Sequence, residues 1–241
     1  MIKLEHITLE LPVDRHMQAS FKTAIGGELF TRNGIRFVKA LNDITALIEP
    51  GDRIGVIGRN GSGKSSLLRL LANIYQPSLG TLQVEGKVST LFTNSLGLYL
   101  RETGRRNVEL GVRLLGLQGG SVADAVEEII EFTELGDYID VPMIAYSAGM
   151  RTRLGFAIAT QIRPDILLVD EVFGAGDMSF VNKAMERMEK MMEGANILIL
   201  ASHSASIITR CCNKALWLNQ GKLQAFGDVE DVMGKFDASV R

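Results

Sequence analysis

Short runs of hydrophobic residues alternate along this chain with segments in which hydrophobic positions recur every three or four residues. The runs at 53–57, 166–169 and 197–201 have the length and composition of strands buried in a parallel sheet. The segments 64–74 and 178–192 have the spacing of helices with one hydrophobic face. Strands and helices in this alternation predict an α/β fold, with a mainly parallel sheet that helices cover on both faces.

Both ends of the chain have patterns typical of further strands. A first strand is expected at 2–11, and the turn-prone residues 12–34 after it are interpreted as an irregular insertion with one short helix. Near the C-terminus, Gln220-Gly221 separates two strand patterns and predicts a hairpin, which is followed by a helix at 229–236. The other expected elements are strands at 35–38, 44–48 and 88–92 and a hairpin at 81–86.

Helical patterns dominate the middle of the chain, and no internal repeat is visible. We therefore expect one domain over residues 1–241, with a helical insert at about 105–160. The helices expected in this insert are one from its cap Asn107 to about 117, one at 122–132 behind the capping-box pair Ser121 and Asp124, and one from near Gly149 to before Arg163.

Composition and charge narrow the function classes. Hydrophobic residues make up 46% and charged residues 22% of the 241 residues, which is ordinary for a globular protein. The formal net charge of −2 argues against nucleic acid as a partner, because such proteins normally carry a basic excess. No run approaches the roughly 18–20 apolar residues that span a bilayer, so a role at a membrane requires docking onto another subunit. The only cysteines, Cys211 and Cys212, are adjacent and are interpreted as reduced thiols.

A glycine-rich motif, G-x-x-x-x-G-K-S, joins the run at 53–57 to the helical pattern that begins at Lys64. Glycines let the backbone curl until successive N–H groups converge on phosphate oxygens, and the following helix adds the positive end of its dipole. Lys64 is expected to reach the β- and γ-phosphates, and the Ser65 hydroxyl is expected to bind Mg²⁺. The expected nucleotide-binding residues of this phosphate loop are Gly58, Arg59, Asn60, Gly61, Ser62, Gly63, Lys64, Ser65 and Ser66.

The run at 166–169 ends in two carboxylates, Asp170 and Glu171. A buried strand ordinarily ends in a turn residue, and a solvated acidic pair is the plain alternative. Next to a phosphate loop, however, a cation and a water molecule must be held beside the γ-phosphate. We therefore assign Asp170 to the Mg²⁺ shell and Glu171 to polarising the attacking water.

The pentapeptide Tyr146-Ser147-Ala148-Gly149-Met150 precedes an expected helix and lies upstream of the acidic strand. It resembles the signature loop of ABC ATPases, usually written Leu-Ser-Gly-Gly-Gln, in which Ser147 and Gly149 match the second and fourth positions. The other three residues depart from the common form. The family's order of phosphate loop, signature, acidic strand and switch histidine is reproduced over nearly the whole chain. Ser147 and the free N–H groups of a helix start form a second anion site in this interpretation, and a plain helix cap in the alternative one.

The resemblance assigns roles to further positions. His203 follows a buried strand pattern and matches the family's switch histidine, which contacts the γ-phosphate, and Asp177 matches the acid of the D-loop. Where the family usually has a glutamine after a strand, this chain has Thr93-Asn94, and either residue is a candidate for contact with the metal or the water. Phe37 is the candidate for stacking on adenine, with a place in the core as its alternative.

The resemblance also implies the architecture and the assembly of the protein. An ABC ATPase has a P-loop NTPase core with a mainly parallel sheet, an antiparallel β subdomain and a helical signature subdomain. The implied cofactors are ATP and Mg²⁺. The implied assembly is a homodimer in which each ATP lies between the phosphate loop of one subunit and the signature loop of the other.

The residues 91–97 and 103–107, with the insertion after the first strand, are similar to exporters of O-antigen and capsule-like polysaccharides. The expected partner is therefore a separate polytopic membrane permease subunit, with this chain peripheral on the cytoplasmic face of the cytoplasmic membrane. Since the chain ends soon after the expected ATPase fold, no added carbohydrate-reading domain is expected.

Three alternative functions are weighed against this one. A soluble ABC ATPase acting in translation or DNA repair normally has tandem domains, a long coiled coil or zinc-binding cysteine clusters, and the sequence contains none of these. A P-loop kinase for a small metabolite leaves the signature loop and His203 unexplained. An ABC transporter ATPase for a different cargo stays open, because the sequence does not name what is carried.

Replacing the proposed water-polarising residue gives a direct test. Glu171→Gln should keep ATP binding but slow hydrolysis by about 10²–10⁴-fold, because an amide is a poor base for the attacking water. Phosphate release measures turnover, and equilibrium titration measures ATP binding. Near-normal turnover in this variant would remove Glu171 from the catalytic role.

Overall fold

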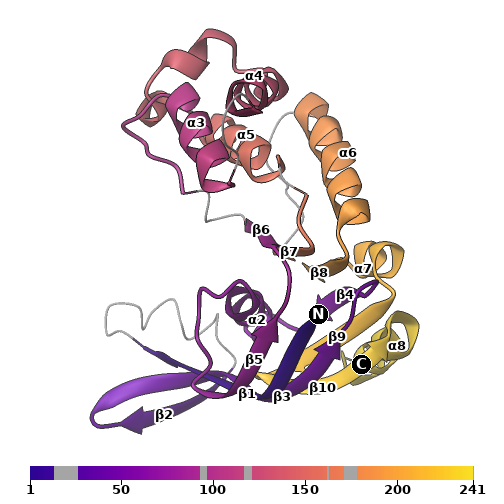
Figure 1. Ribbon diagram of the computed structural model, residues 1–241. Helices are drawn as coiled ribbons and strands as arrows, with labels where there is room; N and C mark the ends of the chain where they lie inside the picture. Colours follow the sequence, from indigo (N-terminus) through magenta and orange to yellow (C-terminus); the bar gives the residue numbers. More distant parts are fainter. Residues whose placement is uncertain (14–26, 93–96, 117–120, 162, 171–177, 241) are drawn as a thin grey trace. The chain divides into compact units, whose positions relative to one another are not determined.

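The computed structural model describes residues 1–13, 27–92, 97–116, 121–161, 163–170 and 178–240. The chain divides into two compact units. The core unit comprises 1–88, 165–171 and 196–241, and the helical unit comprises 89–164 and 172–195. The core unit contains both termini and most of the strands, whereas the helices α3 to α6 belong to the helical unit (Figure 1).

The larger sheet of the core unit contains, in spatial order, β10 (Lys222–Asp228), β9 (Lys214–Asn219), β4 (Arg53–Ile57), β8 (Ile197–Ala201) and β7 (Ile166–Asp170). From β9 to β7 neighbouring strands are parallel, and β10 returns antiparallel along β9. All of β8 and the first four residues of β7 are buried, as expected for strands covered on both faces. The predicted α/β fold with a mainly parallel sheet is confirmed.

A second, antiparallel sheet contains, in spatial order, β2 (Glu28–Arg32), β3 (Ile35–Ile48), β1 (Ile2–Pro12) and β5 (Leu79–Val84). Toward the end of β3, buried and exposed positions alternate strictly, so one face of the sheet supplies hydrophobic side chains to the core. This sheet is the antiparallel β part that the resemblance implies.

The prediction that 12–34 is irregular is wrong for its last residues, which form β2. Asn33 and Gly34 adopt positive φ angles of 51° and 76° and make the tight turn into β3. Asn-Gly between two strands is a strong hairpin signal, because both turn positions need left-handed backbone. The short helix expected in this insertion is not tested, since residues 14–26 lie outside the described part of the chain.

Two other strand predictions are corrected in this sheet. The strands expected at 35–38 and 44–48 are a single strand, because the polar residues between them form a bulge rather than a turn. Asp43 has a φ of 57° at this bulge, and its N–H donates to Thr8 Oγ1 at 3.2 Å. The hairpin expected at 81–86 is also wrong, since β5 is one strand that pairs with β1.

Three helices complete the core unit: α2 (Lys64–Leu71), α7 (Ala205–Cys211) and α8 (Val229–Val240). α2 packs against β3, β7 and β8, α7 against β4, and α8 against β9 and β10. α2 ends before the predicted residue 74, because Asn73 adopts a left-handed conformation with φ 58°. The sequence does not predict α7, since seven residues are too few to establish a helical period.

The two cysteines lie at the end of α7, and both are free thiols. Burial is the main cause that raises the pKa of Cys212 to about 12, so this thiol stays protonated at neutral pH. A methyl group on Gly55 would lie 2.5 Å from Ile208 Cγ2 and 3.5 Å from Cys212 Sγ. Glycine at this point of β4 therefore lets α7 approach the sheet closely.

The helical unit contains α3 (Gly104–Leu114), α4 (Ser121–Thr133), α5 (Ala148–Ala159) and α6 (Met178–Gly194), and β6 (Val88–Phe92) stands at its start. These elements agree with the predicted helices and strand to within a few residues, and the hydrophobic stripe expected on α4 faces the interior. No helix among the described residues combines the length and the hydrophobicity needed to cross a membrane.

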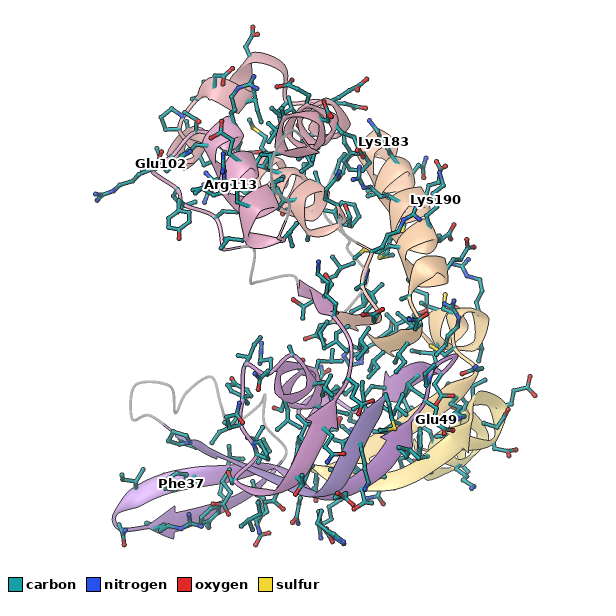
Figure 2. All side chains as sticks on the ribbon, viewed as in Figure 1. Phe37, Glu49, Glu102, Arg113, Lys183 and Lys190 are labelled. Atoms are coloured by element: carbon teal, nitrogen blue, oxygen red, sulfur yellow. The ribbon has the colours of Figure 1, made fainter. Side chains whose placement is uncertain are left out.

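An aromatic cluster holds three of these helices together. Phe132 of α4, Phe156 of α5 and Phe180 of α6 have ring centroids 5.6–6.3 Å apart. Two cations of α6 also lie over the Phe132 ring, with Arg187 at 4.4 Å and Lys183, labelled in Figure 2, at 4.9 Å from its centroid. The cluster therefore packs α4 and α6 against the second half of α5.

The predicted cap of α3 is wrong. The helix begins at Gly104, and the Thr103 side chain caps it by accepting from Arg106 N at 3.1 Å. Asn107 lies one turn inside the helix, where it is buried. Its side chain accepts from Tyr99 N at 2.7 Å and donates to Tyr99 O at 3.0 Å, so it fastens the segment before the helix.

Candidate functional site

The phosphate loop connects β4 to α2, as the sequence predicts. Gly58, Gly61 and Gly63 have φ angles of 146°, 79° and 110°, a region that residues with a side chain rarely adopt. These conformations curl the backbone around the loop and explain why the motif has glycine at these positions. Arg59 and Asn60 are exposed at the tip of the loop.

The strand β3 and the β9–β10 hairpin pack against this loop and support it. A methyl group on Gly63 would lie 2.7 Å from Ala40 O of β3, and one on Gly58 would overlap Leu218 O of β9. In the turn between β9 and β10, Gly221 N donates to Ser62 O at 2.9 Å, and Gly221 O accepts from Asn42 N at 2.8 Å. The turn therefore links the phosphate loop to β3. Sequence reasoning identifies Gly221 only as a hairpin residue, and no motif connects it with the loop.

The loop concentrates positive charge at its centre. Lys64 is the first residue of α2 and is buried, and its Nζ donates to Gly58 O at 2.8 Å and to Arg59 O at 3.2 Å. No acidic residue occupies the first turn of α2, so the positive end of the helix dipole faces the same space. Ser62 Oγ is buried without a hydrogen-bond partner in the described part of the protein. An ammonium group, a helix start and an unpaired hydroxyl are donors that fit a phosphate group.

Other candidate residues lie at the same edge of the parallel sheet. Asp170 ends β7 and is in register with Ala201, the last residue of β8. His203 follows β8 and is exposed, in a turn where Ser202 Oγ accepts from Ser204 N at 3.1 Å. Because β4, β7 and β8 are parallel, their carboxyl ends place the phosphate loop, Asp170 and His203 at one edge, where α/β proteins bind ligands.

Four of the sequence candidates are not placed. Glu171, Asp177, Thr93 and Asn94 lie outside the described residues. Their assigned roles therefore stay predictions.

Phe37, which is labelled in Figure 2, lies on β3. Its ring stacks on Phe30 of β2 with centroids 5.6 Å apart. The Arg32 guanidinium lies over both rings, at 5.3 Å from the Phe30 centroid and 5.7 Å from the Phe37 centroid. Phe37 is partly exposed, so it is not a core residue, and its role in stacking on adenine stays a prediction. Phe30 is not identified from the sequence as the stacking partner of Phe37, because residues 12–34 are interpreted there as irregular.

A second site lies in the helical unit, at the start of α5. Ser147 is the N-cap, and its Oγ accepts from Met150 N at 3.2 Å. Ala148 and Gly149 form the first turn, which carries no acidic residue. A methyl group on Gly149 would meet only Ser147 Oγ, at 3.8 Å, so no local crowding demands glycine there. The predicted helix start and its cap are present, and the role of this helix start as an anion site stays a prediction.

The support from Gly221 can be tested by substitution. Gly221→Ala places a methyl group 2.8 Å from Ala40 O, so the β9–β10 turn must move and the Ser62 carbonyl oxygen loses its hydrogen bond from Gly221 N. The variant should therefore weaken ATP binding about tenfold. Gly34→Ala is the matched control, since Gly34 has nearly the same φ of 76° with no neighbouring atom within 4 Å. Equal ATP affinities of the two variants in equilibrium titration would contradict the support role.

The comparisons with known proteins agree with this geometry. A family model described as ABC transporter matches residues 41–174. The O-antigen export system ATP-binding protein RfbB of Klebsiella pneumoniae is 33% identical over 238 residues, which cover 97% of this chain and 96% of that protein. RfbE of Yersinia enterocolitica, with the same description, is 40% identical over 90% of this chain and 93% of its own length. The teichoic acids export ATP-binding protein TagH of Bacillus anthracis is 33% identical over 98% of this chain but only 42% of its own length.

Solved structures show the same fold. The ATP-binding cassette MJ0796, in a dimeric post-hydrolysis state bound to ADP and Pi, has a TM-score of 0.70 and 20% identity over 95% of this chain and 99% of that one. The ATP binding subunit of an ABC transporter has a TM-score of 0.72 and 20% identity over 98% and 93%. The matched family model and the full-length relatives together establish that this chain belongs to the ABC transporter family, as one of its ATP-binding, ATP-hydrolysing proteins.

Proposed function

We propose that this chain powers the export of an O-antigen-like or capsule-like, lipid-linked polysaccharide through a separate polytopic membrane subunit. The observation that carries the ATP-driven part of the proposal is the presence of two helix starts suited to anions, at α2 in the core unit and at α5 in the helical unit. The relatives named for O-antigen and teichoic acid export support the cargo class. The chain acts as a homodimer, peripheral on the cytoplasmic face of the cytoplasmic membrane.

In this proposal the phosphate loop binds the triphosphate of ATP. Lys64 exchanges its hydrogen bonds to Gly58 O and Arg59 O for bonds to the β- and γ-phosphate oxygens. The N–H groups of 59–66 converge on the same phosphates, and the unpaired Ser62 hydroxyl is available as a further donor. The partly exposed ring of Phe37 is the candidate for the adenine contact.

The chemistry of hydrolysis falls to residues at the carboxyl ends of β7 and β8. The Ser65 hydroxyl and the Asp170 carboxylate are oxygen donors of the kind that Mg²⁺ prefers, and either Thr93 or Asn94 adds a contact. When bound there, Mg²⁺ neutralises charge on the phosphates. Glu171 orients and polarises the attacking water, and His203 contacts the γ-phosphate.

Pairing of two chains brings the second anion site to the same nucleotide. Ser147, Ala148, Gly149 and Met150 of the partner subunit complete the γ-phosphate site, and Asp177 lies at the contact between subunits. Loss of the γ-phosphate removes the charge that both subunits bind, so the pair opens after hydrolysis. The alternation between closed and open pairs drives the membrane subunit. The net charge of −2 gives no support to nucleic acid as an alternative partner.

The export function is tested in source cells from which this chain has been deleted. Deletion should remove the polysaccharide from the cell surface and leave its lipid-linked form inside, because ATP hydrolysis no longer drives export. The unchanged chain and the control Lys235→Ala, at an exposed position of α8, should restore export, whereas Lys64→Ala should not. Normal surface polysaccharide in Lys64→Ala cells would contradict the proposal, and a defect in another transported compound would assign a different cargo.

A further inference from the structure

Tyr146, the residue before the N-cap of α5, is buried with only 2% of its surface exposed. Its hydroxyl donates to Tyr138 O, and it lies against Gly104, the first residue of α3. A methyl group on Gly104 would overlap the Tyr146 hydroxyl, so the contact requires glycine there. Burial is the main cause that raises the pKa of Tyr146, while a backbone hydrogen bond from Gly104 lowers it. The phenol is therefore a neutral donor at physiological pH.

The carbonyl group of Tyr146 is held as well. Arg151, one turn into α5, donates to Tyr146 O from Nε at 3.1 Å and from Nη2 at 2.8 Å. The Arg151 N–H in turn donates to Ser147 O at 3.1 Å. Two donors of one planar guanidinium fix the direction of this carbonyl more firmly than a single flexible donor does. The peptide bond that leads into Ser147 is therefore clamped from the helix side.

The acceptor of the phenol lies in a segment that is itself fastened. Tyr138 belongs to the short 3₁₀-helix η2 (Gly136–Asp140). At its end, Asp140 accepts from Arg105 Nε of α3 at 2.8 Å, and Arg105 Nη1 also bonds Glu127 Oε1 of α4 at 2.9 Å. The Tyr146 hydroxyl therefore connects the loop before α5 to η2, and Arg105 connects η2 to both α3 and α4.

We infer that Tyr146 and Arg151 are positioning residues that set the place and direction of the α5 start for binding nucleotide across the homodimer. The inference rests on the proposed function, since it concerns the loop that meets the partner subunit's nucleotide. Displacement of a ligand-binding group by about 1 Å is enough to weaken such a contact strongly. Because leucine has no hydroxyl to donate, the anchor also gives a physical reason for tyrosine where the common signature form has leucine.

The experiment measures ATP-dependent dimerisation in the Glu171→Gln background, in which hydrolysis is expected to be slow. Tyr146→Phe removes the hydroxyl and keeps the ring. Arg151→Lys keeps the positive charge and removes the two-donor guanidinium contact to Tyr146 O. Each should raise the dimer dissociation constant about tenfold by sedimentation, since a roughly threefold loss applies at each of two loops. The affinity of the dilute monomer for ATP, measured with a fluorescent ATP analogue, should not change.

Matched controls separate positioning from general effects. Tyr138→Phe removes a phenol hydroxyl from a side chain that is 56% exposed and contributes only its carbonyl to the anchor. Arg106→Lys makes the same exchange as Arg151→Lys in an exposed pair with Glu109. Both controls should dimerise as the parent does.

Three results would overturn the inference. They are dimerisation of Tyr146→Phe and Arg151→Lys at the parent's constant, an equal loss in the controls, and a parallel loss of monomer affinity for ATP. Failure of the Glu171→Gln parent to dimerise with ATP would instead count against the proposed function, and the positioning role would fall with it.

Discussion

A loop that binds phosphate must turn its N–H groups and one ammonium group toward a concentrated negative charge, and this requirement shapes much of the core unit. The phosphate loop meets it with three glycines at positive φ and with Lys64 folded across the loop. Such a backbone needs external support, and β3 and the β9–β10 turn supply it through contacts to Gly63 and Ser62. The antiparallel sheet and the closing hairpin thereby position the chemistry at the end of the parallel sheet.

Much of the fold can be predicted from the sequence, because the parallel strands and long helices carry strong periodic signals. The predictions fail where a polar residue is compatible with two different local structures. Asn107 looks like a helix cap but lies inside α3, because Thr103 is the better placed acceptor and Asn107 has backbone partners in Tyr99. The sequence predicts a break between two strands before residue 44, but Asp43 forms a bulge within one strand, because its partner Thr8 is on β1. Tertiary contacts decide both cases, and a single sequence does not reveal them.

The candidate site likewise has parts that the sequence predicts and parts that only tertiary contacts reveal. The phosphate loop, Asp170 and the cap Ser147 are predictable, because their chemistry requires particular residue types at fixed spacing. The residues that hold these groups in place are less visible, because main-chain atoms make many of the contacts. Gly221 supports the loop through its N–H and C=O, and Tyr138 contributes a carbonyl that any residue would supply. A sequence pattern shows which side chains are present but not which main-chain atoms make contacts. These supporting contacts are therefore found only in the folded structure.

The proposed engine requires the two helix starts to act on one nucleotide from different subunits. Mixing two inactive variants, Lys64→Ala and Ser147→Arg, tests it most directly, because only a mixed pair has one site in which both loops are intact. Either variant alone should show almost no ATP turnover, and an equal mixture should recover about a quarter of the wild-type rate, as expected for random two-fold pairing. No recovery in the mixture, or full activity of Ser147→Arg alone, would contradict it.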